Sequence, residues 1–280
     1  MKVIIMRSKS LNLGHEALKE ERMMRLLKGI TAAVPVQYIY LHYNFLAGKA
    51  AREILILVSF KHVRILNELT PILNIIFSGQ MELGYRVFHV HEVEQALLEG
   101  SLFFYYATAA QNCLFSKSGI FLNSGAPKLI AGQVSAMYQN GIDKANKFLS
   151  GATFYFKRQN FEYCAFMLHQ VFDLMYRAIE MLVMGKDKRT HRIKIHQLYI
   201  KPYVKPLSGL FNCSEEEAGL LHLLDEAYLA VRYENNYKIT EPEVVRLFEK
   251  ADLLYVFAEQ VYQGVMNRHF DQQVGGIDVR

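Results

Sequence analysis

Acidic, aromatic and basic side chains recur at helical spacing in two segments of the second half of the chain. In each segment these residues step by three and four positions, so each set shares one face of a helix. The sets are His169, Asp173, Tyr176 and Glu180, then Asp225, Tyr228 and Arg232, with Tyr237 near the end of the second segment. A guanidinium offers planar, bidentate donors for phosphate, and tyrosine rings stack on bases. We therefore expect a nucleotide or RNA to bind at His169, Asp173, Asp225, Tyr228, Arg232 and Tyr237.

Both basic features of this region have a structural alternative. Arg232 would pair with Asp225 or Asp173 and close the helix bundle without any ligand. The basic stretch "GKDKRTHRIKIH", residues 185–196, either contacts an anion or is a solvated connection between two helices. The formal net charge of +5 permits an anionic partner but does not require one.

Other residues that could carry chemistry do not form a convincing site. The three cysteines are far apart and show no CxxC or Cys/His spacing for zinc. In "YRVFHVHEV", read as a strand, His89 and His91 share one face and Glu92 is adjacent, but two ligands hold a metal only weakly. We therefore expect no metal and no cofactor, and we name no catalytic residue.

We expect no signal for export or membrane insertion. The start, "MKVIIMRSKS", has too short an apolar run for a signal peptide, and no segment approaches the roughly 20 apolar residues that span a bilayer. Scattered cysteines suit a reducing compartment. We expect a cytoplasmic protein.

The elements that carry these residues change in kind along the chain. In the first half, "VQYIYLHY" and "EILILVSF" have strand composition and alternate with amphipathic helical segments. From about residue 131 onward, helical spacing dominates. The helix "FEYCAFMLHQVFDLMYRAIEMLVMG" carries an apolar stripe suited to a bundle core, made of Cys164, Leu168, Val171, Met175, Ile179 and Leu182. We predict an α+β protein with a small N-terminal α/β domain and a C-terminal all-α, up-and-down helix bundle.

Three stretches of the second half together resemble the HEPN domain, an all-helical bundle. They are "YFKRQNFEYCAFMLHQVFDLMYRAIEMLVMG", "THRIKIHQL" and "LLDEAYLAVRYENNY", within roughly residues 140–265. Their order is similar to the family's pattern of an aromatic-rich start, a Leu-His-Gln helix, a Thr-His segment and an Arg-Tyr on a later helix. The resemblance implies a homodimer formed through the helices.

The stretch "YIYLHYNFLAGKAAREILILVSF", residues 38–60, is similar to the opening of a minimal nucleotidyltransferase, a frequent neighbour of HEPN domains. That family has a strand ending in Gly-Ser, a loop with a further glycine, and two acids on the next strand. Here Tyr43 and Asn44 stand in place of Gly-Ser, and Gly48 matches the loop glycine. A tyrosine brings a Cβ and a ring to a turn that must approach a triphosphate closely.

The acid pair is also incomplete. Glu53 can be laid on either acid, and the partner position then holds Leu55 or Ala51. Neither offers an oxygen to Mg²⁺, which nucleotidyl transfer requires. We therefore interpret the stretch as a degenerate active site, with Glu53 as a solvent-facing strand residue.

The ribonuclease motif of many HEPN proteins is absent where the family places it. That motif is an arginine followed, after four to six residues, by a histidine. Positions 237–239 after Arg232 hold no histidine. Arg189 and His196 have the spacing, but they lie in the basic connection, and we interpret the match as chance.

We therefore predict a degenerate nucleotidyltransferase-like domain over 1–125 and a HEPN bundle over 130–270. The function we expect is non-catalytic binding of a nucleotide or nucleic acid, in a regulatory or toxin–antitoxin-like role. The alternative is an enzyme with residual nucleotidyltransferase or RNase activity.

Overall fold

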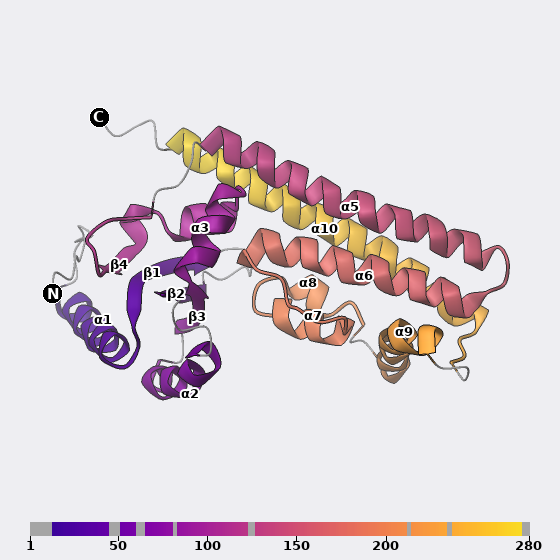
Figure 1. The fold of residues 1–280 in the computed structure, drawn as a ribbon, viewed down its shortest axis with the longest axis horizontal. Helices are drawn as coiled ribbons and strands as arrows, with labels where there is room; N and C mark the ends of the chain where they lie inside the picture. The colour runs from indigo at the N-terminus through magenta and orange to yellow at the C-terminus, as the bar shows by residue number, and fades with distance from the viewer. Residues whose placement is uncertain are drawn as a thin grey trace. The chain divides into compact units, whose positions relative to one another are not determined.

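The computed structural model of the chain describes residues 13–44, 51–59, 65–80, 83–122, 127–211, 214–233 and 237–275. The chain divides into two compact units, Met1–Ala126 and Pro127–Arg280, which we call the first and the second unit. The first contains a sheet with helices, and the second is helical in the part that is described (Figure 1). The predicted α+β fold class is confirmed.

The first unit is built on a four-stranded mixed sheet with strand order β3-β2-β1-β4. The strands are β1 (Val36–Asn44), β2 (Ala51–Val58), β3 (Leu83–His89) and β4 (Cys113–Ser116). Strand β1 runs antiparallel to β2 and β4, whereas β2 and β3 are parallel. The segments 36–44 and 51–58 thus form the strands that their aromatic and β-branched composition indicates.

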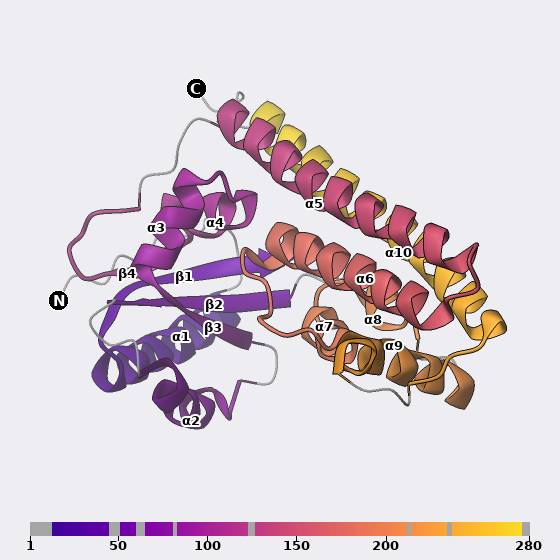
Figure 2. The same cartoon turned by 45° about the vertical axis from the view of Figure 1, so that its right-hand side comes forward.

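Helices cover both faces of this sheet (Figure 2). Helices α1 (Leu13–Ala33) and α2 (Ile65–Phe77) bury their leucines against Ile39, Ile54 and Ile56 on one face. On the other face, α3 (Val90–Leu98) and α4 (Leu102–Ala107) pack against alternate residues of the same strands, such as Tyr40, Leu55 and Leu57. Because both faces are covered, β2 is apolar almost throughout.

The strand predicted over residues 85–93 ends earlier than expected. Strand β3 stops at His89, and α3 begins at Val90. The Glu92 side chain accepts a hydrogen bond from the backbone N–H of His89 at 3.2 Å, which satisfies a donor at the start of the helix. His89 and His91 therefore do not share a strand face.

The second unit is organised around α6 (Phe161–Met184). This helix packs against α5 (Pro127–Phe156), α9 (Glu215–Tyr233) and α10 (Glu241–Gly275), and the shorter α7 (Ile193–Ile200) and α8 (Lys205–Ser208) lie beside it. The predicted apolar stripe of α6 is confirmed, since every residue from Cys164 to Leu182 in that stripe is at most 4% exposed. Gly185 ends the helix with a φ of 68°, a conformation that favours glycine.

Candidate functional site

The polar face of α6 lies opposite its apolar stripe and turns toward α7 and α9. His169, Asp173 and Glu180 lie on it, as their spacing predicts, and Arg177 lies between the two acids. Asp173 is 4% exposed and accepts a hydrogen bond from Arg177 Nε at 2.9 Å. The Tyr176 ring stacks on that of His196 with centroids 5.9 Å apart, and its hydroxyl donates to the Leu207 carbonyl at 2.9 Å. The buried carboxylate of Asp173 needs several hydrogen-bond donors.

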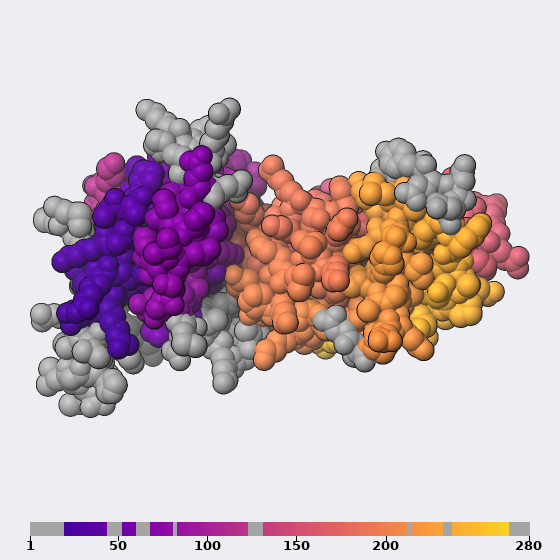
Figure 3. All heavy atoms as spheres, turned by 90° about the horizontal axis from the view of Figure 1, so that it is seen from below, coloured from indigo at the N-terminus to yellow at the C-terminus, as the bar shows by residue number. Residues whose placement is uncertain are grey.

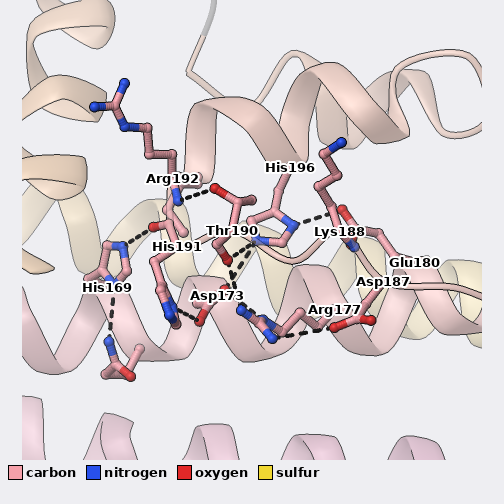
Figure 4. Close-up of polar contacts among 12 residues, drawn as sticks. His169, Asp173, Arg177, Glu180, Asp187, Lys188, Thr190, His191, Arg192 and His196 are labelled. Atoms are coloured by element: carbon pink, nitrogen blue, oxygen red, sulfur yellow. Dashed lines mark hydrogen bonds and ion pairs between the residues drawn. The ribbon is translucent and has the colours of Figure 1, made fainter. Parts of the chain in front are cut away.

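The ring of His196, from α7, supplies the next donors (Figure 4). It is fully buried, with Nδ1 2.8 Å from Glu180 Oε1 and Nε2 3.1 Å from Asp173 Oδ1. Each ring nitrogen lies within hydrogen-bond distance of a carboxylate, an arrangement that favours the protonated imidazolium, in which both nitrogens donate. Burial opposes this charge, but the hydrogen bonds that His196 donates to Asp173 and Glu180 outweigh it and raise the pKa of His196 to about 9.

The two carboxylates respond differently to the same surroundings. Burial would raise the pKa of Asp173, but hydrogen bonds from His196 and Arg177 outweigh it and lower the value to about 2. Burial raises the pKa of Glu180 above its usual value, with His196 working against that change. Asp173 is therefore an anion at neutral pH and can hold a second imidazole.

The connection between α6 and α7, residues 185–192, is fixed by its backbone. Arg177 donates to the Thr190 carbonyl at 2.7 Å, and the Lys188 N–H donates to Glu180 Oε2 at 2.8 Å. Asp225 of α9 accepts from the N–H groups of Ile193 and Lys194 at the start of α7. The side chains of Lys188, Arg189 and Arg192 are exposed, and Figure 4 shows the Arg192 guanidinium pointing away from the buried cluster. The backbone of this connection is therefore held in place, while its basic side chains face outward.

His191 is where this buried network reaches the surface. Its side chain is 47% exposed, and its Nδ1 donates to Asp173 Oδ2 at 3.1 Å. Its ring stacks on Tyr228 of α9, with centroids 4.2 Å apart and planes 18° apart. The His191 carbonyl accepts from Nε2 of His169, whose ring is buried, and this burial lowers the pKa of His169 to about 4. His191 is thus held by a carboxylate, an aromatic ring and its own backbone.

Of the residues predicted from sequence to bind a nucleotide, the structure brings four together. His169, Asp173 and Tyr228 contact one another directly or through His191, and Asp225 caps the neighbouring α7. Tyr237 lies apart from them, 7% exposed, with its hydroxyl donating to the Leu223 carbonyl at 3.0 Å. Arg232 lies on α9, but its side chain is outside the described part of the chain.

Sequence reasoning did not assign three residues of the site, Arg177, His191 and His196. Arg177 could have been found, since it lies four residues after Asp173, the spacing of a helical ion pair. His191 had no such signal, because it lies in an irregular connection. Figure 3 shows the second unit from below, where the salmon to orange atoms of α7 and α9 lie next to one another.

Two further chemistries can be judged from the geometry. Arg189 and His196 have the spacing of the HEPN ribonuclease motif. However, His196 is fully buried between two carboxylates, so its ring does not face a substrate. Within the described ranges, no group of three or more His, Cys, Asp or Glu residues is arranged to hold a metal ion.

In the first unit, the acid that resembled a nucleotidyltransferase carboxylate is buried. Glu53 is 7% exposed, so the expectation of a solvent-facing residue is wrong. Its Oε2 accepts from Arg86 at 2.7 Å, and the Arg86 guanidinium lies 4.5 Å from the centroid of the Phe103 ring. Strand pairing places β3 beside β2 and so brings Arg86 to Glu53. The loop glycine, Gly48, lies outside the described residues.

The geometry of the second unit defines a helix bundle with a buried polar cluster. This cluster reaches the surface at a histidine–tyrosine pair. Residues 138–261 match the HEPN domain family, and the chain therefore contains a HEPN domain. The match does not include the first unit. No curated protein matches the chain. None of the helices in the described ranges has both the length and the apolar character needed to cross a membrane.

Proposed function

We propose that this chain is a non-catalytic HEPN protein that binds a nucleotide or RNA at the surface of His191 and Tyr228. The observation that carries the proposal is the stacked, half-exposed ring of His191, fixed by the buried Asp173. A ring held in this way can stack on a base with little loss of side-chain freedom, because its freedom is already lost on folding. We propose a regulatory or toxin–antitoxin-like role for such a protein.

The charges around the pair support an anionic ligand. Lys188, Arg189 and Arg192 are exposed beside His191 in the chain, whereas Asp173 faces inward and is already occupied by three donors. A base on the outer face of His191 would bring its phosphate toward these cations. We propose that Arg232, on the same helix as Tyr228, adds a further phosphate contact.

The test is fluorescence anisotropy with a labelled single-stranded RNA 12-mer and with labelled ATP, each with and without Mg²⁺. Arg192→Ala and Arg232→Ala should each weaken binding about ten-fold while leaving the melting temperature nearly unchanged. Lys201→Ala, which removes an exposed positive charge at the end of α7, is the matched control and should bind as the parent does. If the parent protein binds none of these ligands, the proposal is contradicted.

We also propose that residues 130–270 act as a homodimeric HEPN bundle and residues 1–125 as a degenerate nucleotidyltransferase-like domain. The ion pair between Glu53 and Arg86 supports the view that this domain is degenerate, since the carboxylate already holds a guanidinium in place of a metal ion. Leu55, which one overlay puts at the second acid, is fully buried and apolar. Light scattering at high concentration tests the dimer, and a strictly monomeric mass would contradict it.

RNA cleavage is a second candidate function, favoured by one observation. The hydrogen bond from His191 Nδ1 to Asp173 orients an exposed imidazole in the way that acid–base catalysis requires. Incubation of the 12-mer with the protein in EDTA, compared with His191→Ala, tests this candidate. Cleavage that His191→Ala abolishes would replace the non-catalytic proposal, and an intact 12-mer would support it.

A further inference from the structure

The end of α5 and the start of α6 carry aromatic rings that face solvent. Phe154 is 50% exposed and Tyr163 is 46% exposed. Tyr155 lies between them, with its ring stacked on Tyr163 at 5.3 Å and in edge contact with Phe154 at 5.4 Å. These three residues, which we call the aromatic tip, form one group of rings at the end of the helical hairpin.

The aromatic tip is distinct from the core beside it. Phe156 turns inward and contacts the rings of Phe161 and Phe248. The core is therefore closed without the three outer rings. Exposing large aromatic surface is unfavourable in water, so a group of outward-facing rings indicates a surface that meets a partner.

Cations accompany these rings. The Arg158 guanidinium lies 3.7 Å from the centroid of the Phe154 ring, and Lys157 beside it is exposed. The nearby carboxylate of Glu162 pairs with Lys238 at 3.3 Å, so its negative charge is offset. Exposed rings with neighbouring positive charges complement a ligand that has flat bases and phosphates, and single-stranded nucleic acid is such a ligand.

Helix α6 links the aromatic tip to residues that hold His191. Tyr163 and Gln170 are seven residues apart and so share a face of this helix. The Gln170 side chain donates to Nδ1 of His169, whose Nε2 donates to the His191 carbonyl. Seven residues of helix span about 10 Å. That length corresponds to about three nucleotides, at roughly 3.4 Å for each along one stacked strand.

We propose that the aromatic tip is a second contact site for single-stranded nucleic acid, whose chain continues to the His191–Tyr228 surface. This inference rests on the proposed function and narrows its ligand from nucleotides in general to a single strand. Duplexes fit less well, because their bases are already stacked on one another and leave no free faces along the strand.

The test compares three probes by anisotropy: labelled ATP, a single-stranded RNA 12-mer and the same 12-mer in a duplex. We expect the parent protein to bind the single strand more tightly than either other probe. The double variant Phe154→Ala, Tyr163→Ala should weaken single-strand binding at least ten-fold and leave ATP binding unchanged. Leu98→Ala, which truncates a residue 75% exposed in the first unit, is the control and should change neither.

Because both tip residues are about half exposed, the double variant should fold, and an unchanged melting temperature will verify this. Phe154→Tyr keeps a ring at the site and should retain binding. If the double variant binds the single strand as tightly as the parent does, the inference is overturned. It is also overturned if the variant loses self-association but keeps RNA binding, because the aromatic tip would then be a protein interface. If ATP binds but the single strand binds no tighter, this inference alone fails. If no probe binds the parent, the proposed function fails with it.

Discussion

The carboxylate of Glu180 accepts a hydrogen bond from the ring of His196 at 2.8 Å, and neither side chain is exposed to solvent. This pair joins α6 to α7 across a connection that contains no regular structure. A buried ion pair contributes little net stability when intact, but loss of one partner leaves a charge without compensation. The pair is therefore a sensitive probe of the site's architecture.

The first prediction is that His196→Ala destabilises the second unit by about 3–5 kcal/mol, the usual cost of breaking a buried pair. Urea unfolding followed by circular dichroism measures it. His222→Ala is the matched control, because His222 pairs with Glu226 at the surface, with side chains 70% and 49% exposed. A loss no larger than that of His222→Ala would show that His196 is not held as described.

The second prediction concerns pH. The folded protein holds a proton on His196 up to about pH 9, whereas the unfolded chain releases it near 6.5. Stability from this group is thus complete below pH 6.5 and is lost as pH rises to 9, by an amount on the order of 3 kcal/mol. His169 acts in the opposite direction, because its lowered pKa makes stability fall between pH 6.5 and about 4.

Stability should therefore be greatest near pH 6.5. Unfolding free energies measured from pH 4 to 10 check this, and His196→Gln should remove most of the decline above pH 6.5. A profile that is flat between pH 6.5 and 9 in the parent protein would contradict the protonated state of His196.

The third prediction is that Val171→Asp unfolds the helix bundle. Val171 is fully buried in the apolar stripe of α6, and an unpaired buried carboxylate costs at least several kcal/mol. Loss of helical circular dichroism and of a cooperative transition measures the effect. Val256→Asp, at a position 52% exposed on α10, should fold normally.

The fourth prediction is that the first unit does not transfer nucleotides. Glu53 is held by Arg86, and Tyr43 and Asn44 occupy the end of β1 where the similar family has glycine and serine. Incubation with labelled ATP, GTP, CTP or UTP and Mg²⁺ should release no pyrophosphate. Release that Glu53→Gln abolishes would sink this account of the unit.

Sequence periodicity predicted the fold because the spacing of apolar residues along each helix and strand marks the face that the element buries. The six stripe residues of α6 and the strand composition of β1 and β2 are local signals, and both gave the correct element. The boundary between β3 and α3 was missed, because the hydrogen bond from His89 to Glu92 starts the helix inside an alternating pattern.

The site was predictable only where it follows a helix. Asp173, Glu180 and Tyr228 were found from their spacing. His191 and His196 come from the connection and α7, and no period links them to α6, so only the folded chain brings them to Asp173. The burial of Glu53 was missed for the same reason, since its partner Arg86 is on another strand.

Stacking of a nucleotide on His191 can be observed by NMR of the histidine rings during titration with AMP. Protein labelled with ¹³C at histidine Cε1 gives one signal for each ring, and His191→Gln assigns that of His191. We expect this signal to move upfield and to saturate as AMP is added, because a stacked base shields the ring, while the signal of the exposed His222 should not shift. AMP binding that leaves the His191 signal in place, or no binding at millimolar AMP, would contradict this expectation.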